Sequence, residues 1–425
     1  MTDLLCANVV SDAYFEDPSA LADDLHLRGD RLGARMLWSA RPGDVTLLSA
    51  APSSVFLDVV ARVLGFMPRI LVISRSGTQT LPEAALTCPD TMRALRNMRI
   101  RAILPYAASL DVYQLGSALG VGVRGPSPGF ARSRRVRTVN SKRAFRRLAP
   151  ILGVPVAAGY LPELEEPIAP TTRGFIVKER LSGGGLGNTL VNHTCELAAA
   201  VNNRVVVERF EDMRSWPSAD FVITPQGRVE FRQLSLMRIT DNAYDGVIIP
   251  AREEAPGLLT ELVRHGRVIG QWWARRGYVG WYDVDGGITK DGRLILTEIN
   301  ARCTGGTPVD AVARSLLGPD YPRRGYLLSR EHLHLSVAPD FVMRLAAEEG
   351  LLVSRDNPYG VIPMWESPEE CALGYLVVGA NRKQVRDLEY RWLDIAGTDL
   401  DFRIPEEVHD AGSGAGREPA VLSGP

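Results

Sequence analysis

Cysteine is scarce in this sequence, and the few cysteines form no pattern. The chain of 425 residues has five of them, an odd number without CxxC spacing: Cys6, Cys88, Cys195, Cys303 and Cys371. This usage argues against a disulfide framework and against a zinc site, and it is typical of a reducing compartment. We therefore expect a cytoplasmic protein.

Long apolar runs and an excess of charge are missing as well. No apolar run reaches membrane-spanning length, and the opening segment MTDLLCANVVSDAYFEDPSA lacks the regions of a signal peptide. The 49 basic and 50 acidic residues leave a net charge of −1. We therefore expect neither a nucleic-acid partner nor a membrane partner. The length predicts roughly two to four globular domains.

Residues 1–137 alternate short apolar runs with helical patterns, which predicts βα units and a parallel sheet. The strand-like runs are DVTLLSA (44–50), RILVIS (69–74) and IRAILPY (100–106). The glycine-containing piece SRSGT (74–78) is too short for a dinucleotide fingerprint. We expect a structural α/β domain.

From residue 138 the pattern changes to an α+β texture dominated by hairpins. One hairpin is expected to turn at Gln226-Gly227 and another at Asp291-Gly292. Residues 326–403 predict two helices and two strands, which we expect to form a small α+β domain. Residues 404–425 contain few large apolar side chains, so we expect a flexible tail.

The stretch LILTEINARCTGGT (294–307) begins as an apolar strand and ends in polar side chains. Side chains two apart in a strand share a face, so Glu298, Asn300 and Arg302 are expected to line up. Oxygen atoms of Glu and Asn suit a hard divalent cation, and an arginine suits a phosphate. Cys303 beside them is interpreted as a packing residue rather than a nucleophile.

The predicted partner strand, WYDVDGG, supplies the second carboxylate that a metal site needs. Its Asp285 is expected at the same end of the hairpin as Glu298, so we predict a metal site formed by Asp285, Glu298 and Asn300. The spacing from Asp285 to Glu298 looks one residue long, and Asp283 therefore stays an alternative ligand.

The segment IVKERLSGGGLGN joins a strand lysine, Lys178, to a glycine loop that contains Gly183, Gly184 and Gly185. Glycines let backbone N–H groups approach a polyphosphate closely, and the lysine can meet the same phosphates. No GK[ST] follows, so this is not a Walker loop. The alternative reading is a flexible hairpin tip.

The segment RVVVERFED ends a valine-rich strand in acidic residues. Glu208 with the backbone around Phe210 could hold the edge of an adenine ring, and Glu211 or Asp212 could reach ribose hydroxyls. The plainer alternative is that these acids are solvated. Lys142, in the basic run at 132–147, is a candidate nucleotide contact.

Two arginines between these segments are candidate substrate contacts. Arg232 or Arg238 could bind a carboxylate or the transferred phosphoryl group, and Arg232 is taken as a candidate catalytic residue.

In order along the chain, these segments resemble the ATP-grasp superfamily. They are SKRAFRRLAPILGVP, FIVKERLSGGGLGN, VVVERFED, GYVGWYDVDGG and LTEINARCTGGT, together about residues 138–320. The resemblance implies a multidomain chain of α/β and α+β parts. We expect a Rossmann-like pre-ATP-grasp domain over 1–137, two ATP-grasp lobes over 138–325 and a small C-terminal domain over 326–403.

The resemblance also implies ATP and Mg²⁺ as cofactors and assigns roles to the candidate residues. Lys142, Lys178 and the loop glycines would contact phosphates, and Arg302 would stabilise the transferred phosphate. The remaining roles implied are adenine binding by Glu208 and the Phe210 backbone, and Mg²⁺ binding by Asp285, Glu298 and Asn300.

The domain layout resembles peptide ligases of the pheganomycin type. That resemblance implies an ATP-dependent carboxylate–amine ligase that passes through an acyl phosphate and releases ADP and phosphate. The expected partners are a small carboxylate, a peptide amine and, as an open alternative, a second copy of the chain. A phosphotransferase on the same scaffold and a non-catalytic nucleotide-binding module stay open as alternative functions.

Overall fold

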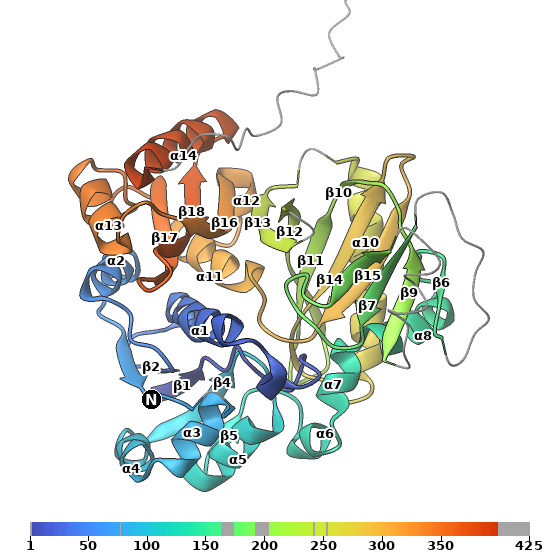
Figure 1. Cartoon of the computed structure of the whole chain (residues 1–425), viewed down its shortest axis with the longest axis horizontal. Helices are drawn as coiled ribbons and strands as arrows, with labels where there is room; N and C mark the ends of the chain where they lie inside the picture. Colours follow the sequence, from blue (N-terminus) through green and yellow to red (C-terminus); the bar gives the residue numbers. More distant parts are fainter. Residues whose placement is uncertain are drawn as a thin grey trace, which may run out of the picture.

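The computed structural model describes residues 2–76, 78–162, 174–191, 204–240, 243–251 and 254–397. The tail expected at 404–425 lies outside these residues. The described residues form three sheets, one of them parallel and two mainly antiparallel (Figure 1).

A five-stranded parallel sheet forms the N-terminal part, in the order β3-β2-β1-β4-β5, which confirms the predicted α/β arrangement. Its central strand was not predicted, because only three of its five residues, Leu4, Leu5 and Cys6, are apolar. All three are fully buried, as expected for a parallel sheet that is covered on both faces. The strands are β1 (Thr2–Cys6), β2 (Val45–Leu48), β3 (Arg69–Val72), β4 (Ile100–Pro105) and β5 (Gly122–Val123).

Helices connect these strands, and local capping sets where several of them begin. The Ser53 hydroxyl accepts the Phe56 N–H at the start of α2, and Thr80 forms a capping box with Glu83 at the start of α3. The helical elements here are α1 (Asp23–Leu32), η2 (Gly33–Ser39), α2 (Ser54–Leu64), α3 (Leu81–Thr87), α4 (Pro89–Asn97), α5 (Leu110–Leu119), α6 (Pro128–Arg132) and α7 (Arg135–Asn140).

A nine-stranded sheet forms the centre of the chain, in the order β10-β14-β11-β12-β13-β16-β18-β17, with β15 paired to β14. Both predicted hairpins are present, and glycines with positive φ, Gly227 and Gly292, form their turns. The first strands are β10 (Met213–Ser215), β11 (Pro217–Ile223), β12 (Val229–Thr240), β13 (Ala243–Ile249), β14 (Gly280–Thr289) and β15 (Leu294–Asn300), with helix α10 (Pro256–Ala274) between β13 and β14.

The strands after residue 325 continue this sheet without a break. Ile248 of β13 pairs with Leu328 of β16. Their helices share a core with the N-terminal part, where Trp38 Nε1 donates to the carbonyl of Met364 over 2.9 Å. The elements are α11 (Gly306–Leu317), α12 (Tyr321–Arg324), β16 (Tyr326–His334), α13 (Pro339–Glu348), β17 (Gly360–Ser367), β18 (Ala372–Gly379) and α14 (Arg382–Ala396).

A smaller four-stranded sheet, ordered β6-β9-β7-β8, lies at the opposite end of the molecule from α13 and α14 (Figure 1). Helix α8 (Lys142–Leu152) precedes it, and Ser141 caps that helix by accepting the Ala144 N–H. Asn140 accepts the Ala301 N–H over 2.7 Å, which ties the start of α8 to the end of β15. The strands are β6 (Gly159–Tyr160), β7 (Phe175–Glu179), β8 (Asn188–Val191) and β9 (Val205–Arg209).

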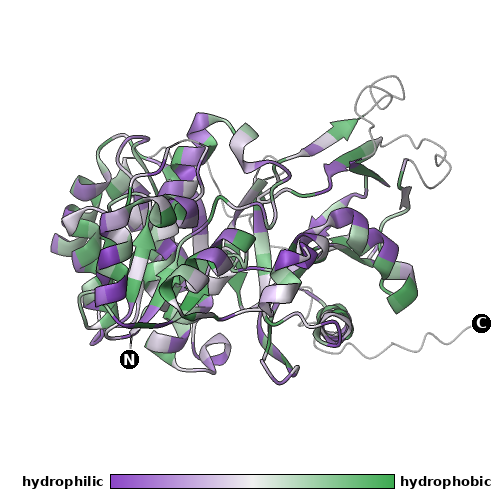
Figure 2. Ribbon diagram, turned by 90° about the horizontal axis from the view of Figure 1, so that it is seen from below, coloured by the Kyte–Doolittle hydropathy of each residue, from purple (hydrophilic) through white to green (hydrophobic). Residues whose placement is uncertain are grey.

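Apolar residues gather on the strands and on one side of many helices, with hydrophilic residues on the outer turns (Figure 2). Among the described residues, none of the helices combines the length and the apolar character that crossing a membrane requires.

Candidate active site

A cavity of about 590 Å³ lies where the N-terminal part, the four-stranded sheet and the nine-stranded sheet meet. We name its two ends after the elements that line them. The glycine-loop end is lined by Lys142, Lys178, Gly183, Gly184, Gly185 and Glu208. The α1 end is lined by Leu25, Arg28, Arg35, Tyr244, Glu331 and His332.

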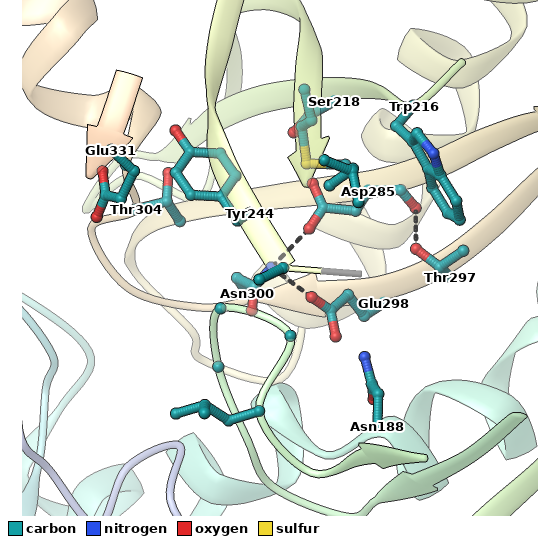
Figure 3. Close-up of a pocket in the computed structure, with 18 of the residues that line it drawn as sticks. Asn188, Trp216, Ser218, Tyr244, Asp285, Thr297, Glu298, Asn300, Thr304 and Glu331 are labelled. Carbon is teal, nitrogen blue, oxygen red and sulfur yellow. Dashed lines mark hydrogen bonds between the residues drawn. The ribbon is translucent and has the colours of Figure 1, made fainter. Parts of the chain in front are cut away.

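Strands β14 and β15 bring the three predicted metal ligands together (Figure 3). Their register places Asp285 opposite Glu298 and Asp283 opposite Asn300. Nδ2 of Asn300 donates to Oδ2 of Asp285 over 2.9 Å and to Oε1 of Glu298 over 3.3 Å. In Figure 3, Glu331 and Tyr244 of the α1 end lie on the other side of Asn300 from Thr297. Lys142 of the glycine-loop end lies 2.8 Å from Glu298, so the acidic cluster lies between the two ends.

A β-bulge accounts for the long spacing between Asp285 and Glu298. The pairing shifts after Asp285, because Gly286 pairs with Leu296 and leaves Thr297 without a ladder partner. The Thr297 hydroxyl instead donates to the Asp285 carbonyl over 3.2 Å. The extra residue is absorbed in β15, and Asp285 keeps its position opposite Glu298.

The carboxyl groups around Asn300 repel one another. Burial, together with neighbouring Asp220, raises the pKa of Asp283 to about 8. Burial, with Asp310 and Asp285 nearby, raises the pKa of Asp220 to about 7. Burial, followed by Asp283 and Glu298, raises the pKa of Asp285 well above its ordinary value.

This cluster fits a divalent cation. Oδ1 of Asp285 is buried and has no hydrogen-bond partner among the described residues. A bound Mg²⁺ would occupy that oxygen and offset the repulsion between the acids. The described residues contain no group of three His, Cys, Asp or Glu side chains arranged for a metal, so the candidate set is two carboxylates and the Asn300 amide.

Glu298 is the one acid of the cluster that stays charged readily. Burial by itself would raise its pKa, but Lys142, then Lys178 and Arg302, lower it to about 2. Nζ of Lys142 lies 2.8 Å from Oε2 of Glu298 and donates to the hydroxyl of Ser182 over 3.0 Å. Lys142 therefore joins the acidic cluster to the start of the glycine loop.

Lys178 and Glu208, predicted for different roles, form one buried ion pair. Strands β7 and β9 run antiparallel, and Nζ of Lys178 lies 2.7 Å from Oε2 of Glu208. Nη1 of Arg146 approaches the other oxygen of Glu208 at 3.4 Å. Two cations already hold the Glu208 carboxylate, and the N–H groups of Arg209 and Phe210 donate to the carbonyls of Ala158 and Gly174 over 2.7 Å and 3.2 Å.

The glycine loop joins β7 to β8 and lines the cavity. Gly184 and Gly185 have φ of 63° and 88°, a conformation that favours glycine. A side chain at Gly183 would come within 3.1 Å of the Arg302 guanidinium. The three glycines therefore let the loop bend and approach Arg302 closely.

Arg302 presents unused donors to the cavity. Its guanidinium carbon lies 4.2 Å from the centre of the Tyr14 ring, and its Nε and Nη1 are buried without partners among the described residues. Such a group suits a planar or tetrahedral anion. The next residue, Cys303, is buried, and burial raises the pKa of its thiol to about 12, so it stays protonated.

Arg232 is the candidate that the structure does not bring to the cavity. It is absent from the lining among the described residues, and its Nη2 lies 3.0 Å from Oδ2 of Asp310. The ladder between β11 and β12 skips Arg232, because Asp220 pairs with Gln233 and Phe221 with Phe231. This bulge re-aims the arginine toward α11, and the catalytic role of Arg232 stays a prediction that this geometry does not support.

The other predicted contacts have partners of their own. Glu211 lines the cavity and pairs with Arg293 over 3.0 Å, while Asp212 pairs with Lys290 over 2.9 Å. Phe210 also lines the cavity. Arg238 lies 3.5 Å from Glu389, outside the lining that the described residues form.

Asp220 belongs to the site but was not predicted. It lines the cavity, lies in β11 opposite Asp283, and accepts a hydrogen bond from Nε2 of Gln233 over 2.9 Å. The available signal was an acidic residue inside the apolar strand PSADFVI. Nothing local in the sequence marks Arg28 or Tyr244 as cavity residues.

Comparison with known proteins identifies the fold. A family model described as the pre ATP-grasp domain matches residues 33–121. No relative was found among curated proteins.

Solved structures with the same fold cover nearly the whole chain. The synthetase for N5-carboxyaminoimidazole ribonucleotide from Thermus thermophilus is 13% identical, with a TM-score of 0.58 over 96% of this chain and 100% of that one. Biotin carboxylase from Campylobacter jejuni, a β,γ-ATP complex, is 13% identical, with a TM-score of 0.59 over 92% and 90%. The Aspergillus clavatus synthase, in complex with ADP and 5-aminoimidazole ribonucleotide, is 15% identical, with a TM-score of 0.52 over 85% and 99%.

The chain therefore has an ATP-grasp fold preceded by a pre-ATP-grasp domain, as the sequence predicts.

Proposed function

We propose that this chain is an ATP-dependent ligase that joins a carboxylate to an amine. The observation that carries the proposal is the composition of a single cavity. It is lined by three carboxyl groups with raised pKa values, two buried lysines and the guanidinium of Arg302, whose Nε and Nη1 have no partner among the described residues. Nucleotide phosphates with Mg²⁺ supply both the anions and the cation that this arrangement lacks.

Each candidate residue has a role in this proposal. Asp285, Glu298 and Asn300 would hold Mg²⁺, which supplies positive charge beside the phosphates. Lys142 and the glycine loop would bind phosphate oxygens, and the Phe210 backbone would meet the base. Lys178 would reach the phosphates from its pair with Glu208.

Arg302 would orient the donor carboxylate and the phosphoryl group that reaches it. The carboxylate oxygen attacks the terminal phosphorus, the bond to the leaving ADP breaks, and an acyl phosphate forms. The amine then attacks the acyl carbon, loses a proton, and inorganic phosphate leaves. Similar structures that were solved in complex with ADP or ATP support a nucleotide at this site.

The proposal also names the amine that accepts the activated acyl group. We propose a peptide amine, on the resemblance of the domain layout to peptide ligases of the pheganomycin type. The cavity extends beyond the acidic cluster to Tyr244 and Glu331, which leaves room for a substrate of that kind.

Trapping with hydroxylamine tests the reaction class. The full chain is incubated with ATP, Mg²⁺, hydroxylamine and a panel of carboxylic acids, and the expected result is an acid-dependent hydroxamate with ADP release. A phosphorylated acid that is stable to hydroxylamine would point to phosphotransfer instead. ADP release that no acid or amine affects would contradict the proposal.

A further inference from the structure

One face of helix α1 forms a wall of the cavity. Its lining residues recur every three or four positions and continue into η2, so they share one side of the helix. They are Leu25, Arg28, Gly29, Leu32 and Arg35. The wall is therefore apolar apart from two arginines.

The two arginines differ in their partners. Nη1 of Arg35 lies 2.6 Å and 2.8 Å from the two carboxylate oxygens of Glu331, so Arg35 already has an anionic partner. Arg28 has no ion pair among the described residues, and its Nε is buried without a hydrogen-bond partner. Asp245, the other acid at this end, is engaged by Arg330 at 3.4 Å and by the hydroxyl of Thr240.

A second polar atom without a partner belongs to His332, which lines the same end. Nδ1 of His332 is buried and unpaired among the described residues, while its Nε2 lies 3.0 Å from Nε2 of His334. Burial, then Arg28 and His334, lowers the pKa of His332 to about 4, so the ring is neutral near pH 7. In the tautomer in which Nε2 accepts a hydrogen bond from Nε2 of His334, Nδ1 carries the proton and can donate to an anion.

Arg28 is half-buried, and its buried Nε costs free energy on an apolar wall unless a ligand accepts its hydrogen bond. We infer that the α1 end binds a second anionic group of the substrate, a carboxylate or a phosphate, through Arg28 and His332. This inference rests on the proposed function, in which Arg302 holds the reacting carboxylate. The substrate is therefore an acid with two anionic groups joined by an apolar segment that packs on Leu25 and Leu32.

Binding of simple diacids tests the inference without turnover. Succinate, glutarate and adipate are titrated calorimetrically into the full chain with Mg²⁺ and ADP, each beside its monomethyl ester. For at least one chain length, the diacid is expected to bind about tenfold or more tightly than its ester, the range of one charge-assisted contact. Arg28→Gln is expected to abolish that difference, and Arg28→Lys to keep part of it.

Arg31→Gln is the matched control. Arg31 is in the same helix but pairs with Glu369 and is absent from the cavity lining in the described part of the chain. This variant is expected to keep the full preference for diacids. Tighter binding of γ-phosphonobutyrate than of glutarate would identify the second group as a phosphate, and the reverse order would identify a carboxylate.

The inference is overturned if the wild-type chain binds no diacid more tightly than its ester, or if Arg28→Gln keeps the preference. The hydroxamate assay separates this failure from failure of the proposed function. If hydroxamate forms but no diacid is preferred over its ester, the second anion site is contradicted and the proposed ligase activity is not. If the chain forms no hydroxamate but prefers a diacid, and Arg28→Gln abolishes that preference, the second anion site is supported and the proposed ligase activity is contradicted.

Discussion

The two ends of the cavity differ in how their buried charges are balanced. At the glycine-loop end each lysine has an acid of its own, with Lys142 2.8 Å from Glu298 and Lys178 2.7 Å from Glu208. At the α1 end, Arg28 has no such acid among the described residues. Paired charges are held in position before a ligand arrives, whereas an unpaired charge is balanced only by the ligand itself.

This difference suggests a division of labour. An end whose charges are already paired can bind the same cosubstrate in every turnover with little rearrangement. An end with an unpaired cation discriminates, since a neutral ligand leaves that cation uncompensated.

The largest effect is expected from Glu298→Gln. This near-isosteric change removes the charge that pairs with Lys142 and contributes to the proposed metal site. We expect hydroxamate formation to fall by about a thousandfold, the scale at which one charge-stabilising group acts in catalysis. Glu261→Gln, at an exposed position in α10, is the control and should keep full activity. If Glu298→Gln keeps a turnover rate within a few-fold of the wild type, Glu298 does not take part in the reaction.

Lys178→Met tests whether the paired end is both structural and functional. Among the described residues, the buried Glu208 would keep Arg146 alone as a cationic partner, at 3.4 Å, so the free energy of unfolding should fall by about 3–5 kcal/mol. The double variant Lys178→Met/Glu208→Gln should recover most of that stability but none of the lost turnover. Urea titration and the hydroxamate assay measure the two quantities separately.

Equal stabilities of the single and double variants would show that the Lys178–Glu208 pair does not stabilise the fold. Recovery of turnover in the double variant would show that Lys178 acts only by neutralising Glu208.

The parts that could be predicted from the sequence are those that neighbouring residues determine. Glycines with positive φ mark the hairpin turns at Gly227 and Gly292, and Ser141 caps α8 through a bond to a residue three positions on. Alternation along a strand is equally local, and it brought Glu298 and Asn300 to one site.

The parts that could not be predicted depend on distant pairings. A bulge decides that Arg232 leaves the cavity, and a bulge is a property of two strands together. The sheet continues from β13 into β16, and the local sequence pattern of neither strand indicates that the two pair. Arg28 reaches the cavity only because α1 packs against β17 and η2.

The acidic cluster between the two ends predicts how stability depends on pH. The folded-state pKa values of Asp220 and Asp283, about 7 and about 8, lie above the unfolded value of about 3.9. The stability they contribute is full below that unfolded value and is lost as the pH rises through about 8. Without Mg²⁺, the Tm should therefore be lower at about pH 8.5 than at about pH 6.

Mg²⁺ is expected to raise the Tm more at the higher pH, because it favours the ionised cluster. Asp283→Asn should flatten the dependence measured without the metal. A Tm that rises between these two pH values in the metal-free wild type would contradict the arrangement of acids described above.

The smallest effect is expected from Arg232→Ala, which separates a substrate contact from a structural arginine. The Arg232 guanidinium pairs with Asp310 and lies 5.2 Å from the centre of the Trp281 ring. Asp310 keeps Arg314 at 2.7 Å, so the buried carboxylate is not left alone. We expect the free energy of unfolding to fall by about 1 kcal/mol and turnover to stay within about twofold of wild type. If Arg232→Ala loses as much turnover as Glu298→Gln while the fold stays intact, Arg232 takes part in catalysis. Its side chain would then have to point from β12 into the cavity.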